Sequence, residues 1–201
     1  MSCFYLIASL PALTFLQKPL ITPDAFQALC EAQLAAADQR AAALLARELD
    51  PDAETISVHP FVARWRAREI QLRNAIARAR AARRKRDAAS SIRPHDGFDT
   101  GIEDAVENAF DLPTPIEREQ ALDRLRWTVL DELAGVDPFA VSVVLAYVVK
   151  LRIAQRWAAL DTEAALARVD KALSKTGSDD REQDTIEGKQ QPPASGSQYE
   201  G

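Results

Sequence analysis

Two histidines are the side chains of this sequence best suited to acid–base or metal chemistry, and the chain has no others. His59 directly precedes Pro60, a position typical of a residue at the start of a helix. His95 lies in a segment whose carboxylates could bind a hard cation: Asp96, Asp99, Glu103 and Asp104. Because these acids lack the alternating spacing of an EF-hand loop, we predict no metal site.

The sequence also lacks a motif for nucleophilic or cofactor chemistry. Cys3 and Cys30 stand among apolar neighbours in no metal-binding or redox spacing, which is typical of buried thiols in a reducing compartment. The phosphate-binding pattern GxxxxGK[ST] is missing from a chain that has 7 glycines. We therefore predict no catalytic residue, no cofactor and no small-molecule ligand, and we expect a protein that is not an enzyme.

One pair of adjacent acids stands near the expected end of a helix. The negative end of the helix dipole disfavours carboxylates such as Asp131 and Glu132 at that position. We expect a partner protein, or an internal arginine such as Arg124 or Arg126, to neutralise them.

A basic segment is the strongest local signal in the sequence. Residues 61–86 contain ten Arg or Lys and a single Glu. At about 100° per residue, four arginines fall within roughly 40° of arc and extend over about 27 Å of helix: Arg66, Arg73, Arg80 and Arg84. This arginine stripe is a candidate surface for a protein partner. Plain solvation is the next interpretation, and nucleic acid is disfavoured because Trp65 alone is available for base stacking.

Composition and punctuation predict an all-α protein. Ala and Arg, which favour helices, are abundant, and strand-forming residues rarely alternate. Six helices are expected to start at Pro23, near Ala36, at Pro60, near Ile102, at Pro115 and at Pro138. We expect the second to end at Leu49, the third at Asp87 and the last near Leu173, with the first half of the last helix buried on all sides.

The two ends of the chain differ from this helical part. Residues 3–16 are apolar and could form a short helix or a buried extended stretch, since periodicity cannot decide at this length. From Ser174 the composition turns polar and acidic, which predicts a disordered tail over 174–201 after one helical domain over 1–173. The apolar run from Phe139 to Val149 is shorter than the ~20 residues of a membrane span, so we expect a soluble, cytoplasmic protein.

Four stretches in this order resemble a known family: FYLIASLPAL at 4–13, KPLITPDAFQALCEAQL at 18–34, WRAREIQLRNAIARARAARRKRD at 65–87 and LDRLRWTVLDELAGVDPFAVSVVLAYVVKLRIAQRW at 122–157. The family consists of short, all-helical bacterial proteins usually encoded in V-type (A/V-type) ATPase operons. It resembles a reduced form of the C subunit of these ATPases, whose eukaryotic counterpart is the d subunit. The resemblance spans about residues 3–165 and leaves out the tail.

The resemblance implies a helical bundle related to the fold of the C subunit, and a non-enzymatic role. Such a subunit or accessory protein forms a helical socket between the central shaft and the membrane rotor ring, at the inner membrane. Partner contacts are then expected at Tyr5, Leu10, Pro11 and the arginine stripe. The alternative is a helical adaptor or nucleic-acid-associated protein that uses the basic helix 60–87.

Overall fold

A computed structural model describes residues 3–47 and 59–161 of the chain. The chain divides into two compact units, Met1–Ala158 and Ala159–Gly201, and the fold described below is that of the first. Every regular element within the described residues is a helix, which confirms the all-α prediction. The predicted boundary at residue 173 and the tail 174–201 lie outside the described residues.

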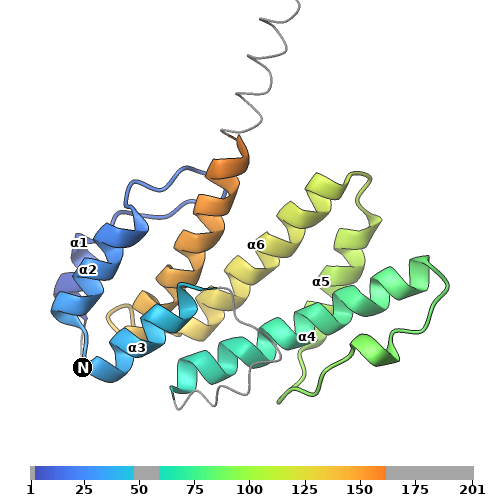
Figure 1. The fold of residues 1–201 in the computed structure, drawn as a ribbon, viewed down its shortest axis with the longest axis horizontal. Coiled ribbons are helices and arrows are strands. Elements are labelled where there is room, and N and C mark those ends of the chain that lie inside the picture. The colour runs from blue at the N-terminus through green and yellow to red at the C-terminus, as the bar shows by residue number, and fades with distance from the viewer. Residues whose placement is uncertain (1–2, 48–58, 162–201) are drawn as a thin grey trace, which may run out of the picture. The chain divides into compact units, whose positions relative to one another are not determined.

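The elements follow one another in a simple order (Figure 1). They are α1 (Phe4–Ser9), α2 (Pro23–Gln33), α3 (Ala36–Leu45), α4 (Pro60–Arg83), the 3-10 turn η1 (Ala89–Ser91), α5 (Thr100–Asp111) and α6 (Pro115–Ala134). A final helix is described over residues 141–161. Residues 3–16 are thus a short helix that ends at Ser9, followed by irregular chain.

Local capping explains why the predicted helix starts at prolines are confirmed for α2 and α6. The Thr22 hydroxyl accepts a hydrogen bond of 3.2 Å from the Ala25 N–H. Thr114 and Glu117 form a reciprocal capping box, in which the Glu117 N–H donates to Thr114 Oγ1 and the Thr114 N–H donates to Glu117 Oε2. Both arrangements satisfy backbone donors that a helix start leaves free.

Three predicted helix bounds are wrong by a turn or less. α3 ends at Leu45, and α4 ends at Arg83 because Lys85 adopts a left-handed φ of 51°. The Arg86 N–H then donates to the Ala81 carbonyl over 2.9 Å, which closes the end of α4. The final helix begins at residue 141, not at Pro138, because Asp137 and Ala140 form a separate turn first.

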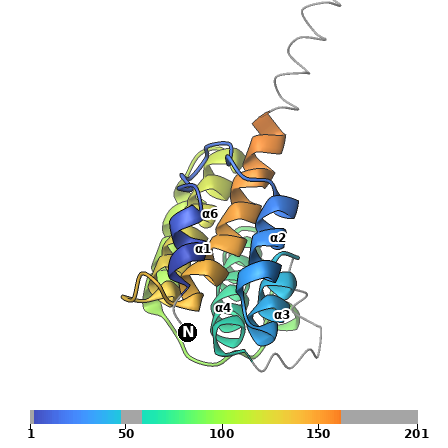
Figure 2. The same ribbon diagram turned by 90° about the vertical axis from the view of Figure 1, so that its left-hand side faces the viewer.

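The final helix is the centre of the hydrophobic core. Val144, Leu145 and Val149 are fully buried, but residues 141–143, Tyr147 and Lys150 are half-buried, so the predicted burial on all sides does not hold along that face. Figures 1 and 2 show this helix, in orange, between α2 on one side and α6 on the other. The α4, α5 and α6 helices also pack against one another, each in contact with the other two. Trp65 and Phe61 are the largest fully buried side chains that α4 contributes.

Candidate functional site

A buried carboxylate on α4 organises a group of charged side chains inside the bundle. Glu69 accepts hydrogen bonds from Nε of Arg73 on its own helix over 2.9 Å and from Nε of Arg126 on α6 over 3.0 Å. A second nitrogen of Arg126 lies 3.1 Å from the other Glu69 oxygen. This two-point contact fixes α6 against α4, because a bidentate arginine pair has a defined geometry.

A second carboxylate extends this network to the final helix. Asp123 is 1% exposed and accepts hydrogen bonds from Arg126 over 2.9 Å and from the indole N–H of Trp157 over 2.8 Å. Arg156 also donates to Asp123. We call Glu69, Arg73, Asp123, Arg126 and Arg156 the buried ion network. It joins three helices that are far apart in the sequence.

The network favours the charged forms of Glu69 and Arg126. Burial by itself would raise the pKa of the Glu69 carboxyl, but Arg126 and then Arg73 hold that pKa below its usual value. Burial would lower the pKa of Arg126, whereas Glu69 and then Asp123 raise it. An ion group of this kind is satisfied by its own partners and serves packing, so we do not assign it a ligand.

The predicted arginine stripe is therefore not one surface. Arg73 belongs to the buried ion network, and Arg66 is half-buried near the other end of α4. Only Arg80 and Arg84 of the four are exposed. The structure separates these arginines because the middle of α4 packs against α6 through Glu69 and Arg126, where Arg73 joins the contact, whereas Arg80 and Arg84 line a cleft near the end of α4.

Arg80 and Arg84 instead lie beside arginines that the stripe did not include. Arg83 of α4 and Arg118 of α6 line the same cleft, with Phe110 of α5 between them. Arg83 donates to the Phe110 carbonyl, and its guanidinium lies 5.3 Å from the centre of the Phe110 ring. We call this the arginine cleft. Helical periodicity within α4 could not have found it, because the cleft takes residues from three helices.

The N-terminal residues that were predicted to bind a partner divide into two places. Tyr5 is 82% exposed and makes an edge contact with Phe4, whose ring lies 4.9 Å from that of Phe139. Leu10 and Pro11 are half-buried, and the Pro11 carbonyl accepts a hydrogen bond of 2.9 Å from the Tyr147 hydroxyl. Tyr5 is the most exposed of the three, while Leu10 and Pro11 line a groove of about 260 Å³ beside α6 and the final helix. We call Phe4, Tyr5 and Phe139 the aromatic patch.

Comparison with known proteins places the chain in a family. Residues 56–169 match the family model described as "Protein of unknown function (DUF2764)". The chain belongs to the DUF2764 family. The matched segment contains α4, α5, α6 and the buried ion network. No curated protein and no solved structure matches the chain.

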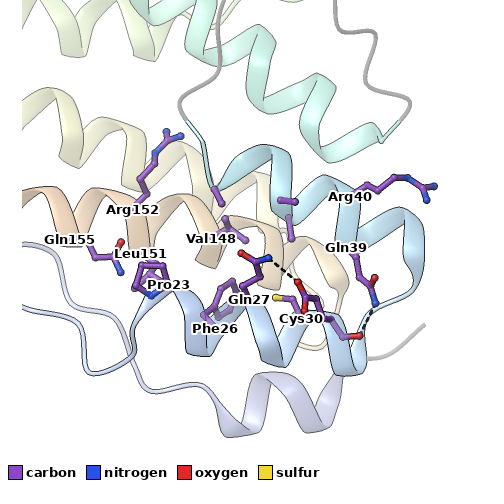
Figure 3. A pocket seen from close by; sticks show the side chains of 14 residues that line it. Pro23, Phe26, Gln27, Cys30, Gln39, Arg40, Val148, Leu151, Arg152 and Gln155 are labelled. Atoms are coloured by element: carbon purple, nitrogen blue, oxygen red, sulfur yellow. Dashed lines mark hydrogen bonds between the residues drawn. The ribbon is translucent and has the colours of Figure 1, made fainter.

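An apolar groove of this DUF2764 protein lies away from most of the predicted site residues. It has a volume of about 350 Å³ between α2, α3 and the final helix, with Phe26, Cys30, Val148 and Leu151 on its walls (Figure 3). Burial, with smaller contributions from Cys3 and Glu31, raises the pKa of the Cys30 thiol to about 11. The thiol is therefore protonated near neutral pH and poorly suited to act as a nucleophile.

Several of the polar residues singled out in the sequence have structural partners in the DUF2764 body, whereas the buried Nδ1 of His95 has no hydrogen-bond partner among the described residues. His59 caps α4, with Nδ1 accepting from the Phe61 N–H over 3.2 Å, which confirms its predicted place at a helix start. Asp99 caps α5, and Glu103 pairs with Arg78. Asp131 pairs with Lys150, not with Arg124 or Arg126 as expected from the sequence.

Metal ligands and membrane-spanning helices are both missing from the described part of the chain. Within 3–47 and 59–161, no three His, Cys, Asp or Glu side chains are grouped so that they could hold a metal ion. None of the helices in those two ranges combines the length and the apolar character needed to cross a bilayer.

Proposed function

We propose that this DUF2764 protein is a non-enzymatic subunit or accessory protein of a bacterial V-type ATPase. In this role it is a helical socket between the central shaft and the membrane rotor ring, in the cytoplasm at the inner membrane. Its partners are other subunits of the ATPase, and it needs no cofactor. The proposal rests on the resemblance of four sequence blocks to a family related to the C subunit.

The observation that carries the proposal is how these four blocks meet in space. The fourth block, residues 122–157, contacts each of the other three. Tyr147 binds the Pro11 carbonyl of the first block and stacks on Phe26 of the second at 5.1 Å between ring centres. Arg126 binds Glu69 of the third block. Because the four blocks pack against one another, they belong to one folded body. Four similarities within one folded body support a shared origin with the family better than four unconnected similarities would.

An exposed aromatic patch supports a role in binding proteins. The ring of Phe4 contacts the rings of Tyr5 and Phe139. Phe4, Tyr5 and Phe139 nevertheless remain 48%, 82% and 37% exposed. Tyrosine and phenylalanine are enriched where protein interfaces bury their central residues. The patch includes Tyr5, which is one of the residues that the resemblance marks as partner contacts. We propose that the patch binds another subunit of the ATPase.

The test is affinity purification of the tagged full-length chain from its native organism, with mass spectrometry of the proteins that come with it. We expect shaft and rotor-ring subunits of the ATPase with the wild-type chain, and a loss of at least fivefold with Tyr5→Ala. Phe98→Ala is the matched control, because Phe98 is a 64% exposed aromatic residue outside the patch. ATPase subunits absent from the wild-type sample would contradict the proposal.

The alternative function predicts a different result in the same experiment. A helical adaptor would bring down unrelated proteins, and a nucleic-acid-associated protein would bind DNA or RNA with a steep dependence on salt concentration. The basic residues that such a protein would use are those at the end of α4.

A further inference from the structure

We propose that the arginine cleft is a docking site for an acidic protein segment that carries an apolar side chain between its carboxylates. The cleft lies where the ends of α4 and α5 meet the start of α6. The proposal rests on the residues of the cleft alone and does not require the assignment to an ATPase.

Positive charge is concentrated in the cleft. Arg80, Arg83, Arg84 and Arg118 line it, and Glu119 is the one carboxylate among the described residues on its walls. Glu119 approaches Arg80 only to 3.9 Å, and the side chain of Arg80 is 60% exposed. The lining therefore holds an excess of three positive charges, which are solvent-accessible and unfavourable to one another.

The fold itself explains only part of this concentration. Arg80 and Arg83 lie in the last turn of α4, where the helix dipole favours cations. Arg118 lies near the start of α6, where the dipole disfavours a cation, and it is held there by the carbonyls of Leu112 and Pro113. The Arg84 side chain has no hydrogen bond or ion pair with the residues that the structure describes. Arg84 is thus the one of the four arginines whose side chain has no partner among the described residues, while Arg118 is stabilised by two carbonyls at the end of α5.

The floor of the cleft is apolar, and this distinguishes between anionic ligands. Phe110, Pro115 and Leu122 are the apolar part of the lining of the cleft, whose volume is about 270 Å³, and we call them its floor. Such a volume suits one large apolar side chain, whereas a phosphate group has no use for it. The Arg83 guanidinium covers one face of the half-buried Phe110 ring, so a base cannot stack on that face. Charge complementarity and the floor together favour an acidic peptide over a nucleic acid.

The test begins with an unbiased selection on the full-length chain. A random 12-residue peptide library displayed on phage is selected against immobilised protein at about 50 mM salt. We expect enriched peptides in which Asp or Glu flank Leu, Ile, Phe or Met. A selection that enriches no peptides, or only peptides without acidic residues, would overturn the proposal.

The best peptide is then measured by fluorescence polarisation against matched variants. Arg80→Glu/Arg84→Glu should weaken binding at least tenfold, and about 300 mM salt should weaken binding to the wild-type chain because exposed charges are screened. Arg64→Glu is the control, since Arg64 is exposed on the same helix about 30 Å from Arg84 at about 1.5 Å per residue. Circular dichroism of all variants establishes that their helices remain.

Two further outcomes would overturn the proposal. One is equal binding of the peptide to the wild-type chain and to the Arg80→Glu/Arg84→Glu variant. The other is that inorganic phosphate or a 12-nucleotide oligo-dT displaces the labelled peptide at a lower concentration than the unlabelled peptide needs to displace it. Because the assay uses only purified protein and peptide, it can succeed or fail independently of the ATPase co-purification.

Discussion

Asp123 is the buried carboxylate that joins α6 to the final helix. It accepts from Arg126, Arg156 and Trp157 and is 1% exposed. Removing a buried ionic partner leaves the remaining charge uncompensated, which is far more costly than losing an exposed pair. The stability of the body should therefore depend on this carboxylate much more than on the acids at its surface.

Asp123→Ala should lower the free energy of unfolding by about 3–5 kcal/mol. The measurement is urea unfolding followed by circular dichroism at 222 nm. Asp131→Ala is the control: the Asp131 side chain is 63% exposed and pairs with Lys150, so its loss should cost below about 1 kcal/mol. Equal losses in the two variants would show that the buried ion network does not stabilise the fold.

Glu69 gives the network a pH dependence whose sign follows from its lowered pKa. The folded-state pKa lies below the ordinary value of 4.5, so the folded protein binds this proton more weakly than the unfolded chain. The stabilisation is fully present above about pH 4.5 and is lost as the pH falls through the folded-state pKa. The stability advantage of the wild-type chain over Glu69→Gln should shrink on acidification between about pH 6 and 3. An advantage that stays constant or grows in that range would contradict this account.

At the scale of the elements, Gly135 separates α6 from the final helix. Its φ is 80°, and an added Cβ would meet no atom within 4 Å, so only the backbone conformation requires glycine. Gly135→Ala should lower the free energy of unfolding by about 1–3 kcal/mol. Val136→Ala, at a fully exposed position next to it, should have little effect. Thermal unfolding measures both, and similar melting temperatures for the two variants would exclude strain at Gly135.

Local signals predicted the elements well, and long-range contacts could not be predicted. Thr22 and Thr114 cap helices through residues three positions away, so the sequence contains both partners of each contact within one turn. Glu69 and Arg126 are 57 residues apart, and Asp123 and Trp157 are 34 apart. Nothing in a periodic pattern pairs such residues, and for this reason helical spacing predicts the arginine stripe as one surface although Arg73 joins the buried ion network.

The candidate surfaces illustrate the same limit. Helical spacing singles out Arg80 and Arg84, but Arg83, Arg118 and Phe110 join them only after α4, α5 and α6 have packed. The resemblance singles out Tyr5, Leu10 and Pro11, of which Tyr5 is exposed whereas Leu10 and Pro11 are half-buried on the wall of a groove. The sequence therefore indicates which segments to inspect and does not indicate which side chains in them reach the surface.

At the scale of the whole molecule, the described body combines a braced interior with two chemically different surfaces. The buried ion network holds α4 and α6 to the final helix, which is the centre of the hydrophobic core. The aromatic patch and the arginine cleft remain open to partners. A body of this kind suits a part that connects other proteins and does no chemistry itself. This is the role that we propose within a V-type ATPase.

Lysine cross-linking with mass spectrometry, applied to the ATPase solubilised from the native organism, tests that claim most directly. Lys85 follows Arg84 at the end of α4 and therefore reports on the arginine cleft, whereas Lys18 reports on the second sequence block of the resemblance. We predict cross-links from these lysines to the shaft and rotor-ring subunits. A purified ATPase that lacks this chain, or cross-links only to proteins outside the ATPase, would contradict the account.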